Sequence, residues 1–218
     1  MESALLRAAR RGDLGACRRL RATGVAARAD DNFALRVAAA YGHLHVCQWL
    51  HATFRLTAAD ARSRNNDALR FAAANGHLEL CRWLHATFAL TTADARAREN
   101  YALQWAVLNG HLDVCRWLCA TFALTAADAR GGDNLALRRA AQHGYLGVCR
   151  WLHATYALTA ADARAADNYA LRWAALGGHL GACQWFHETF GITTAEWEAS
   201  ALAGKLKPHV AAWIASLE

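Results

Sequence analysis

The stretch GHLDVCRWLCATF, residues 110–122, decides the fold, because closely similar wording returns along the whole chain. The copies read GHLHVCQWLHATF from Gly42, GHLELCRWLHATF from Gly76, GYLGVCRWLHATY from Gly144 and GHLGACQWFHETF from Gly178, with a more divergent GDLGACRRLRATG from Gly12. Successive copies begin 34 residues apart, after a first step of 30. A fixed period in this range is typical of a solenoid, in which each unit buries its apolar side by stacking on its neighbours.

Each repeat predicts two helices joined by a tight link. In the repeat that begins at Asp60, Leu69, Ala72 and Ala73 have the spacing of one helix side, and this pattern ends at an Asn-Gly pair, a common helix end. The helical spacing then resumes from His77 through the CRWLHATF segment, which predicts a longer second helix.

An asparagine precedes the first helix of each internal repeat: Asn32, Asn66, Asn100, Asn134 and Asn168. Asparagine tolerates left-handed backbone better than most residues. We therefore expect a tight turn here, at the tip of a hairpin-like loop.

These residues resemble the ankyrin repeat. The resemblance is carried by ALRVAAAYGHLHVCQWL (34–50), ALRFAAANGHLELCRWL (68–84) and ALQWAVLNGHLDVCRWL (102–118), which match the family's PLHxAAxxGHxxVVxxLL core. It covers nearly the whole chain and implies an all-α, ankyrin-type α-solenoid of stacked helix-turn-helix units with hairpin-like loops. The wording VCRWLHATYALTAADAR (148–164) is further similar to ankyrin families that are expanded in giant viruses of amoebae.

The chain is predicted to form a single ankyrin-repeat domain over residues 1–218. A capping repeat of about 1–29 carries arginines where internal repeats are apolar, and the internal repeats fill about 30–192. The pattern breaks in 193–218, yet VAAWI at 210–214 is similar to VCRWL, so this segment is interpreted as a degenerate C-terminal cap.

Composition favours a protein that acts inside a cell. The opening residues lack the apolar segment of a signal peptide, and no run of about 18 apolar residues predicts a membrane span. The seven cysteines are an odd number, and six recur in register, which favours a reducing compartment. We expect the chain in the cytoplasm or nucleus, or, if it is virus-encoded, in the host cell or the virion.

Cysteine and histidine stand four residues apart in several repeats, as in Cys47 and His51 or Cys81 and His85, and Cys115 and Cys119 occupy the same two positions. Thiolates and imidazoles bind zinc, so a metal ladder is conceivable. Core packing is favoured, because the resemblance implies valine and leucine here and cysteine behaves as a small apolar residue. We predict neither a metal site nor a cofactor.

Nothing in the sequence predicts an enzyme. The chain has no G-x-S-x-G, CxxC or HExxH motif and no phosphate-binding glycine loop. The histidines of the GHL segments are implied by the resemblance to make structural hydrogen bonds between neighbouring loops.

Two rows of arginine return with the repeat period. The first row lies beside the turns and comprises Arg28, Arg62, Arg96, Arg130 and Arg164. The second row, broken by Gln104, comprises Arg36, Arg70, Arg138 and Arg172. The resemblance implies that both rows border the concave face. Alternatively, the arginines are solvated or paired, because Asp60 and its equivalents repeat two positions before the first row.

Aromatic residues stand among positions that vary between repeats, and aromatic and arginine side chains are the usual anchors of interfaces. The predicted partner-binding residues are Arg36, Arg70, Tyr101, Trp105, Arg138, Tyr169, Arg172 and Trp173.

The leading hypothesis is a non-enzymatic protein-protein interaction module that binds a partner with an acidic or mixed surface. A structural or self-assembling component, for example of a virion, is the alternative. The net charge of +6 also raises nucleic-acid binding, which ranks lower because lysine is scarce and acidic residues interrupt the arginine rows.

Overall fold

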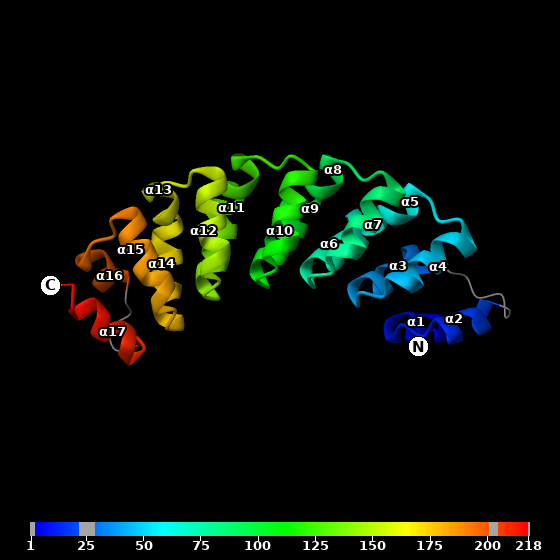
Figure 1. Cartoon of the computed structure of the whole chain (residues 1–218), viewed down its shortest axis with the longest axis horizontal. Coiled ribbons are helices and arrows are strands. Elements are labelled where there is room, and N and C mark those ends of the chain that lie inside the picture. Colours follow the sequence, from blue (N-terminus) through cyan, green and yellow to red (C-terminus); the bar gives the residue numbers. More distant parts are fainter. Residues whose placement is uncertain (1–2, 22–28, 201–204, 218) are drawn as a thin grey trace. The chain divides into compact units, whose positions relative to one another are not determined.

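The structure is a computed structural model that describes residues 3–21, 29–200 and 205–217. Within these ranges the regular elements are helices and no strand occurs, which confirms the predicted all-α fold (Figure 1). The helices are α1 (Ala4–Arg11), α2 (Leu14–Arg21), α3 (Ala29–Ala40), α4 (Leu44–Phe54), α5 (Ala58–Ala61), α6 (Ser63–Ala74), α7 (Leu78–Phe88), α8 (Thr92–Ala95), α9 (Ala97–Leu108), α10 (Leu112–Thr121), α11 (Ala126–Gln142), α12 (Leu146–Tyr156), α13 (Ala160–Ala163), α14 (Ala165–Gly177), α15 (Leu180–Phe190), α16 (Thr194–Ser200) and α17 (Pro208–Ala215).

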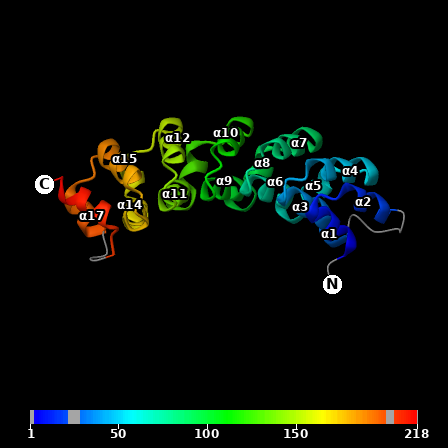
Figure 2. The ribbon, with the colours of Figure 1, turned by 60° about the horizontal axis from the view of Figure 1, so that its bottom comes forward.

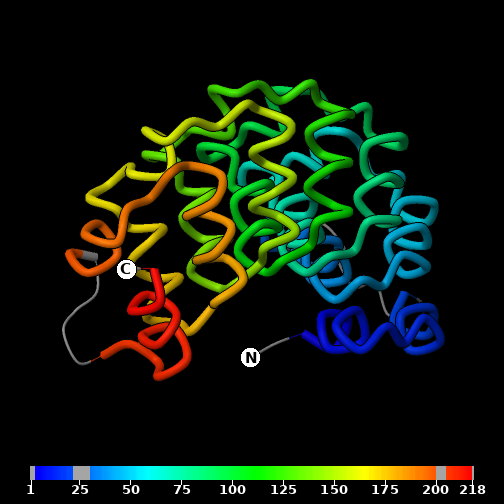
Figure 3. Tube along the Cα trace, turned by 60° about the vertical axis from the view of Figure 1, so that its left-hand side comes forward, coloured from blue at the N-terminus to red at the C-terminus, as the bar shows by residue number. Residues whose placement is uncertain are grey.

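The chain divides into two compact units, Met1–Ala123 and Leu124–Glu218. In the first unit the first helices α1, α3, α6 and α9 pack on one another in succession, and the second helices α2, α4, α7 and α10 do the same. Figure 2 shows these helices as two layers. In the second unit α11 packs on α14 and α12 on α15, and Figure 3 lets the chain be followed from each second helix to the next repeat.

Small and branched apolar residues form the core of each stack. Ala72 and Ala73 on α6 are fully buried, and their short side chains let neighbouring first helices approach closely. Leu50 and Leu84 fill the second layer. Burying a leucine stabilises the fold by about 1.5–3 kcal/mol. The first helices also bury leucines, Leu35, Leu69 and Leu103, so both layers contribute to the stability.

The link between the two helices of a repeat requires glycine. Gly76 has φ of 77°, a left-handed conformation that costs side-chain-bearing residues energy. A Cβ atom there would also lie 2.6 Å from Nδ1 of His111 in the next repeat. The glycine of one GHL segment therefore lies in close contact with the histidine of the next.

The predicted hairpin-like loop has two parts. A one-turn helix comes first, and in α5, α8, α13 and the start of α11 it begins with a threonine-aspartate capping box. In α5, Thr57 donates its backbone N–H to Oδ2 of Asp60 over 2.7 Å, and its hydroxyl donates to the same oxygen. This box satisfies groups that a short helix leaves without partners.

A left-handed turn of three residues follows. Arg64, Asn65 and Asn66 have φ of 53°, 58° and 63°, and the same conformation recurs in α3, α9, α11 and α14 with asparagine always third. The prediction that asparagine takes left-handed backbone is confirmed. Left-handed backbone at three consecutive residues costs energy for residues other than glycine, so contacts with neighbouring groups must stabilise the turn.

The residues of the predicted C-terminal cap form α16 and α17. Pro208 is the first residue of α17, where proline is favoured. Trp197 is fully buried and its ring centroid lies 5.6 Å from that of Trp213. Helix α17 packs on α15, where His187 lies 5.9 Å from Trp213, and α16 packs on α14.

Candidate functional site

The first arginine row bridges neighbouring repeats. Arg62 donates Nε to Oδ1 of Asp94 over 2.8 Å and Nη2 to Oδ2 over 3.0 Å. Arg130 pairs in the same way with Asp162. The paired alternative is therefore confirmed for these arginines, but with the aspartate of the following repeat and not the one two positions earlier.

Another arginine of this row pairs with a glutamate in place of an aspartate. Arg164 pairs with Glu196, which stands in α16 where internal repeats have aspartate, with Nε 2.5 Å from Oε1. Arg28 lies outside the described residues. A bidentate arginine-carboxylate pair fixes the orientation of both groups, so Arg62, Arg130 and Arg164 each align one repeat on the next.

The turn asparagine joins the same network. Nδ2 of Asn66 donates to Oδ1 of Asp94 over 3.1 Å, and Nδ2 of Asn32 donates to Asp60 over 3.0 Å. Burial by itself would raise the pKa of the Asp94 carboxyl, but hydrogen bonds from Arg62, Thr91 and Asn66 lower it overall. Each such aspartate thus ties the one-turn helix of its own repeat to the left-handed turn of the preceding one.

The second arginine row holds the left-handed turns. Arg36 donates to the carbonyl oxygens of Asp30 and Asp31 over 2.8 and 3.0 Å. Arg138 donates to the carbonyls of Gly132 and Asp133 at 3.1 and 3.3 Å. The carbonyl groups of a left-handed turn are not paired within a helix and need hydrogen-bond donors, which the guanidinium group supplies.

The remaining members of this row behave alike. Arg70 donates to the carbonyl of Arg64, and Arg172 donates to the carbonyl and the carboxylate of Asp167. Gln104, which breaks the row in sequence, donates Nε2 to the Glu99 carbonyl over 2.6 Å. An amide can therefore replace the guanidinium group at this position.

Asp67 brings two of these arginines together in the first unit. Its Oδ2 atom accepts from Nη1 of Arg36 over 2.8 Å, and its Oδ1 atom accepts from Nη2 of Arg70. Arg70 is 2% exposed, and burial together with the nearby charge of Arg98 lowers its pKa. The guanidinium groups of Arg36 and Arg70 are mostly enclosed by their own chain.

A half-buried tyrosine and an exposed tryptophan form a pair in each unit. The rings of Tyr101 and Trp105 stack with centroids 5.2 Å apart, and the guanidinium carbon of Arg70 lies 4.6 Å from the Tyr101 centroid. We call this the first aromatic cluster. Trp105 is 38% exposed, which is unusual for a large apolar side chain.

The second unit repeats this arrangement 68 residues later. Tyr169 and Trp173 have ring centroids 5.7 Å apart, and the Arg138 guanidinium lies 4.4 Å from the Tyr169 ring. Trp173 is 39% exposed, and the Tyr169 hydroxyl donates to Oε1 of Gln142 over 3.2 Å. We call this the second aromatic cluster.

The structure thus brings six of the eight predicted residues into two clusters. Arg36 and Arg172 lie outside them and contact turn backbone. Binding by any of the eight stays a prediction. Besides Tyr41, Trp105 and Trp173 are the large apolar side chains that the described residues expose.

The cysteines pack in the core, as predicted. All seven are buried and none of them forms a disulfide. Burial raises the pKa of Cys81, Cys149 and Cys183 to about 12, so these thiols stay protonated at neutral pH. The described residues contain no group of three or more side chains that could hold a metal ion.

The histidines four residues after the cysteines have a role that sequence analysis missed. Nδ1 of His51 hydrogen-bonds to the Leu56 carbonyl over 3.0 Å, and the ring meets Phe88 of the next repeat edge to face at 5.2 Å. His85 and His153 make equivalent contacts. The 34-residue period could have predicted this contact, because it places the histidine of one repeat and the phenylalanine of the next on facing helices.

Three of the four GHL histidines, His43, His77 and His179, make the structural hydrogen bonds that the resemblance implies. At the fourth, His111, the corresponding carbonyl of Ala74 accepts instead from Nδ2 of Asn109 over 2.6 Å. Nε2 of His43 lies 2.9 Å from the Arg10 carbonyl oxygen, and Nε2 of His179 lies 2.9 Å from that of Gln142. His209 in α17 has an equivalent contact with Gly178 that the sequence did not predict.

Comparison with known proteins identifies this class of fold. The family model described as ankyrin repeats (3 copies) matches residues 5–94, 51–128 and 69–162. These matches cover more than half of the chain, so the chain belongs to the ankyrin-repeat family. Members of this family are generally protein-protein interaction modules and typically not enzymes. None of the curated proteins matches the chain.

Proposed function

We propose that the chain binds a partner protein through the two aromatic clusters, without catalysing a reaction. The exposure of Trp105 and Trp173 is the observation that supports this proposal. Each tryptophan presents an apolar surface beside a tyrosine that an arginine covers, one in each unit. Arginine, tyrosine and tryptophan are the residues that dominate binding energy at protein interfaces.

The arginines contribute to these clusters in a particular way. Arg70 and Arg138 lie against the tyrosine rings and donate to turn carbonyls, so they position the aromatic surface. The more exposed Arg172, with a third of its side chain accessible, is the better candidate to meet a partner carboxylate. A partner with apolar anchors and some acidic residues fits this surface.

Membrane insertion plays no part in this proposal. Among the described residues, no helix has the length and apolar character to cross a bilayer. Seven buried cysteines that form no disulfide favour a reducing compartment such as the cytoplasm or nucleus. The similarity to giant-virus families stays a prediction.

The proposal is tested by affinity capture from a nuclease-treated lysate of the cells in which the chain occurs naturally. The natural chain is compared with a Trp105→Ala/Trp173→Ala variant and with Tyr41→Ala, which removes the other exposed large ring. Loss of an aromatic anchor costs on the order of 2 kcal/mol, or about 30-fold in affinity.

We expect one protein to be recovered with the natural chain and with Tyr41→Ala but lost with the double variant. Cross-linking should then map that protein to the two clusters. Equal recovery with all three chains would count against the clusters as the binding site. Recovery of the bait itself would favour the self-assembling alternative.

A further inference from the structure

The first repeat carries a concentration of positive charge that the aromatic clusters do not use. Residues 3–21 contain one acidic residue, Asp13, and six arginines: Arg7, Arg10, Arg11, Arg18, Arg19 and Arg21. All six arginines are exposed. Since the whole chain has a formal net charge of only +6, most of its excess charge lies on α1 and α2.

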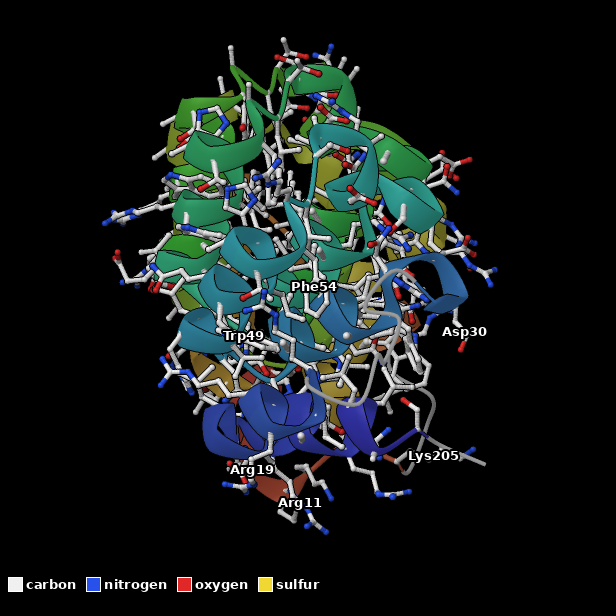
Figure 4. All side chains as sticks on the ribbon, turned by 90° about the vertical axis from the view of Figure 1, so that its right-hand side faces the viewer. Arg11, Arg19, Asp30, Trp49, Phe54 and Lys205 are labelled. Carbon is white, nitrogen blue, oxygen red and sulfur yellow. The ribbon has the colours of Figure 1, made fainter. Side chains whose placement is uncertain are left out.

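These arginines border a shallow groove between α1 and α2. The groove has a volume of about 290 Å³ and a floor of small and apolar side chains, Ala4, Ala8, Ala16 and Leu20. Its rim is formed by Arg7, Arg11, Asp13 and Arg19. Figure 4 shows Arg11 and Arg19 on the outer side of the first repeat, pointing away from the helices stacked behind it.

The groove corresponds to a surface that internal repeats bury. The residues of the second repeat that align with Ala8, Ala16 and Leu20 are Ala38, Val46 and Leu50, and all three are fully buried. Arg19 aligns with Trp49, an apolar ring. The first repeat therefore keeps the apolar floor of a stacking surface but surrounds it with charge, and the residues that line it belong to this repeat alone.

Two of the arginines on this rim have no ionic partner among the described residues. Arg11 and Arg19 form no ion pair with a described residue, and the carboxylate of Asp13 accepts the backbone N–H of Ala16 over 2.7 Å at the start of α2. Uncompensated arginines around an apolar floor are complementary to a ligand that is apolar on one side and anionic on the other.

We propose that this groove binds an acidic amphipathic helix of a partner protein. The apolar side of that helix lies on Ala8, Ala16 and Leu20, and its carboxylates meet Arg11 and Arg19. Helix-in-groove binding of this kind uses apolar residues at helical spacing as anchors. A nucleic acid fits less well, because its phosphates gain nothing from the alanine and leucine floor.

The groove shares no residue with the aromatic clusters, so its test can fail without counting against the proposed function. Its test uses a fluorescein-labelled peptide that places leucines on one side of a helix and glutamates on the other, with binding followed by fluorescence anisotropy. The test variant is Arg11→Glu/Arg19→Glu. The matched control is Arg116→Glu/Arg150→Glu, which changes the net charge equally at exposed arginines of α10 and α12.

We expect the test variant to weaken peptide binding at least about tenfold and the control to weaken it less than about twofold. Circular dichroism checks that both variants are folded, and Arg11→Gln/Arg19→Gln replaces the first variant if charge reversal unfolds the repeat. Binding should also weaken as salt is raised, because exposed charges are screened.

Several outcomes would overturn the proposal. These are absence of peptide binding, equal loss in the two double variants, and undiminished binding of a peptide in which serine replaces every leucine. Tighter binding of single-stranded DNA or of phosphatidylserine vesicles than of the peptide would assign the groove to a different class of partner.

Discussion

Arg62 and Asp94 are 32 residues apart in sequence and form a two-point ion pair between neighbouring repeats, with Nε 2.8 Å from Oδ1 and Nη2 3.0 Å from Oδ2. The same carboxylate accepts from Thr91 and Asn66. Asp94 is 7% exposed, so the carboxylate that joins the one-turn helix to the left-handed turn lies largely away from solvent, whereas the Arg62 side chain is 37% exposed. The repeat interface is therefore held by directional polar contacts as well as by apolar packing.

Removing the Asp94 carboxylate should destabilise the chain strongly. Asp94→Ala leaves Arg62, Asn66 and Thr91 without their shared acceptor; Arg62 can turn to solvent, but the buried amide of Asn66 cannot, and an unsatisfied buried donor costs about 1–3 kcal/mol. The free energy of unfolding from urea titrations measures the loss. Glu79→Ala is the control, because the Glu79 to Arg82 pair is exposed and such pairs contribute less than about 1 kcal/mol. Equal losses would show that the network does not stabilise the interface.

The left-handed turns allow a reciprocal test. Gly132 and Ala166 occupy equivalent first positions of their turns, with φ of 61° and 51°. Alanine is strained at positive φ, so Ala166→Gly should raise the free energy of unfolding by about 1 kcal/mol and Gly132→Ala should lower it by a similar amount. Thermal and urea unfolding of both variants measure this, and changes of the same sign in the two would contradict the assigned turn.

Much of the fold follows from the period. The glycine before each second helix and the apolar spacing around it predict where helices such as α7 begin, and α7 starts at Leu78 with His77 just before it. The stacking of Tyr101 on Trp105 is also within reach of the sequence, since residues four apart share one side of a helix.

Contacts between repeats were harder to predict, because they depend on how far one repeat is displaced on the next. Both arginine rows have the same period and the same residue type, yet Arg62 bridges two repeats while Arg36 holds turn carbonyls. Nothing within one repeat distinguishes these roles. The placement of Arg70 over Tyr101, 31 residues later, likewise requires the stacked structure.

The core thiols should be unreactive in the folded chain. Burial raises the pKa of Cys81 and Cys149 to about 12 and keeps reagents away from the sulfur atoms. We expect almost no reaction of the native chain with Ellman's reagent at neutral pH and full reaction of all seven cysteines in guanidinium chloride. Ala86→Cys, at an exposed position of α7, is the positive control and should add one thiol that reacts at once. Rapid reaction of a natural thiol in the native chain would contradict the assigned packing.

Acid should destabilise the second unit through Glu196 and Asp162. Hydrogen bonds from Arg164 and Thr193 lower the pKa of Glu196 from 4.5 to about 2. Burial opposes ionisation of Asp162, but hydrogen bonds from Arg130 and its neighbours still lower its pKa from 3.8 to about 2. Because the unfolded chain takes up these protons first, the stability from both groups is fully present above about pH 4.5 and is lost as the pH falls toward 2. Urea titrations across this range should therefore show a smaller loss for Glu196→Gln, which cannot titrate, than for the natural chain; identical pH profiles would mean that the Arg164 pair does not couple folding to protonation.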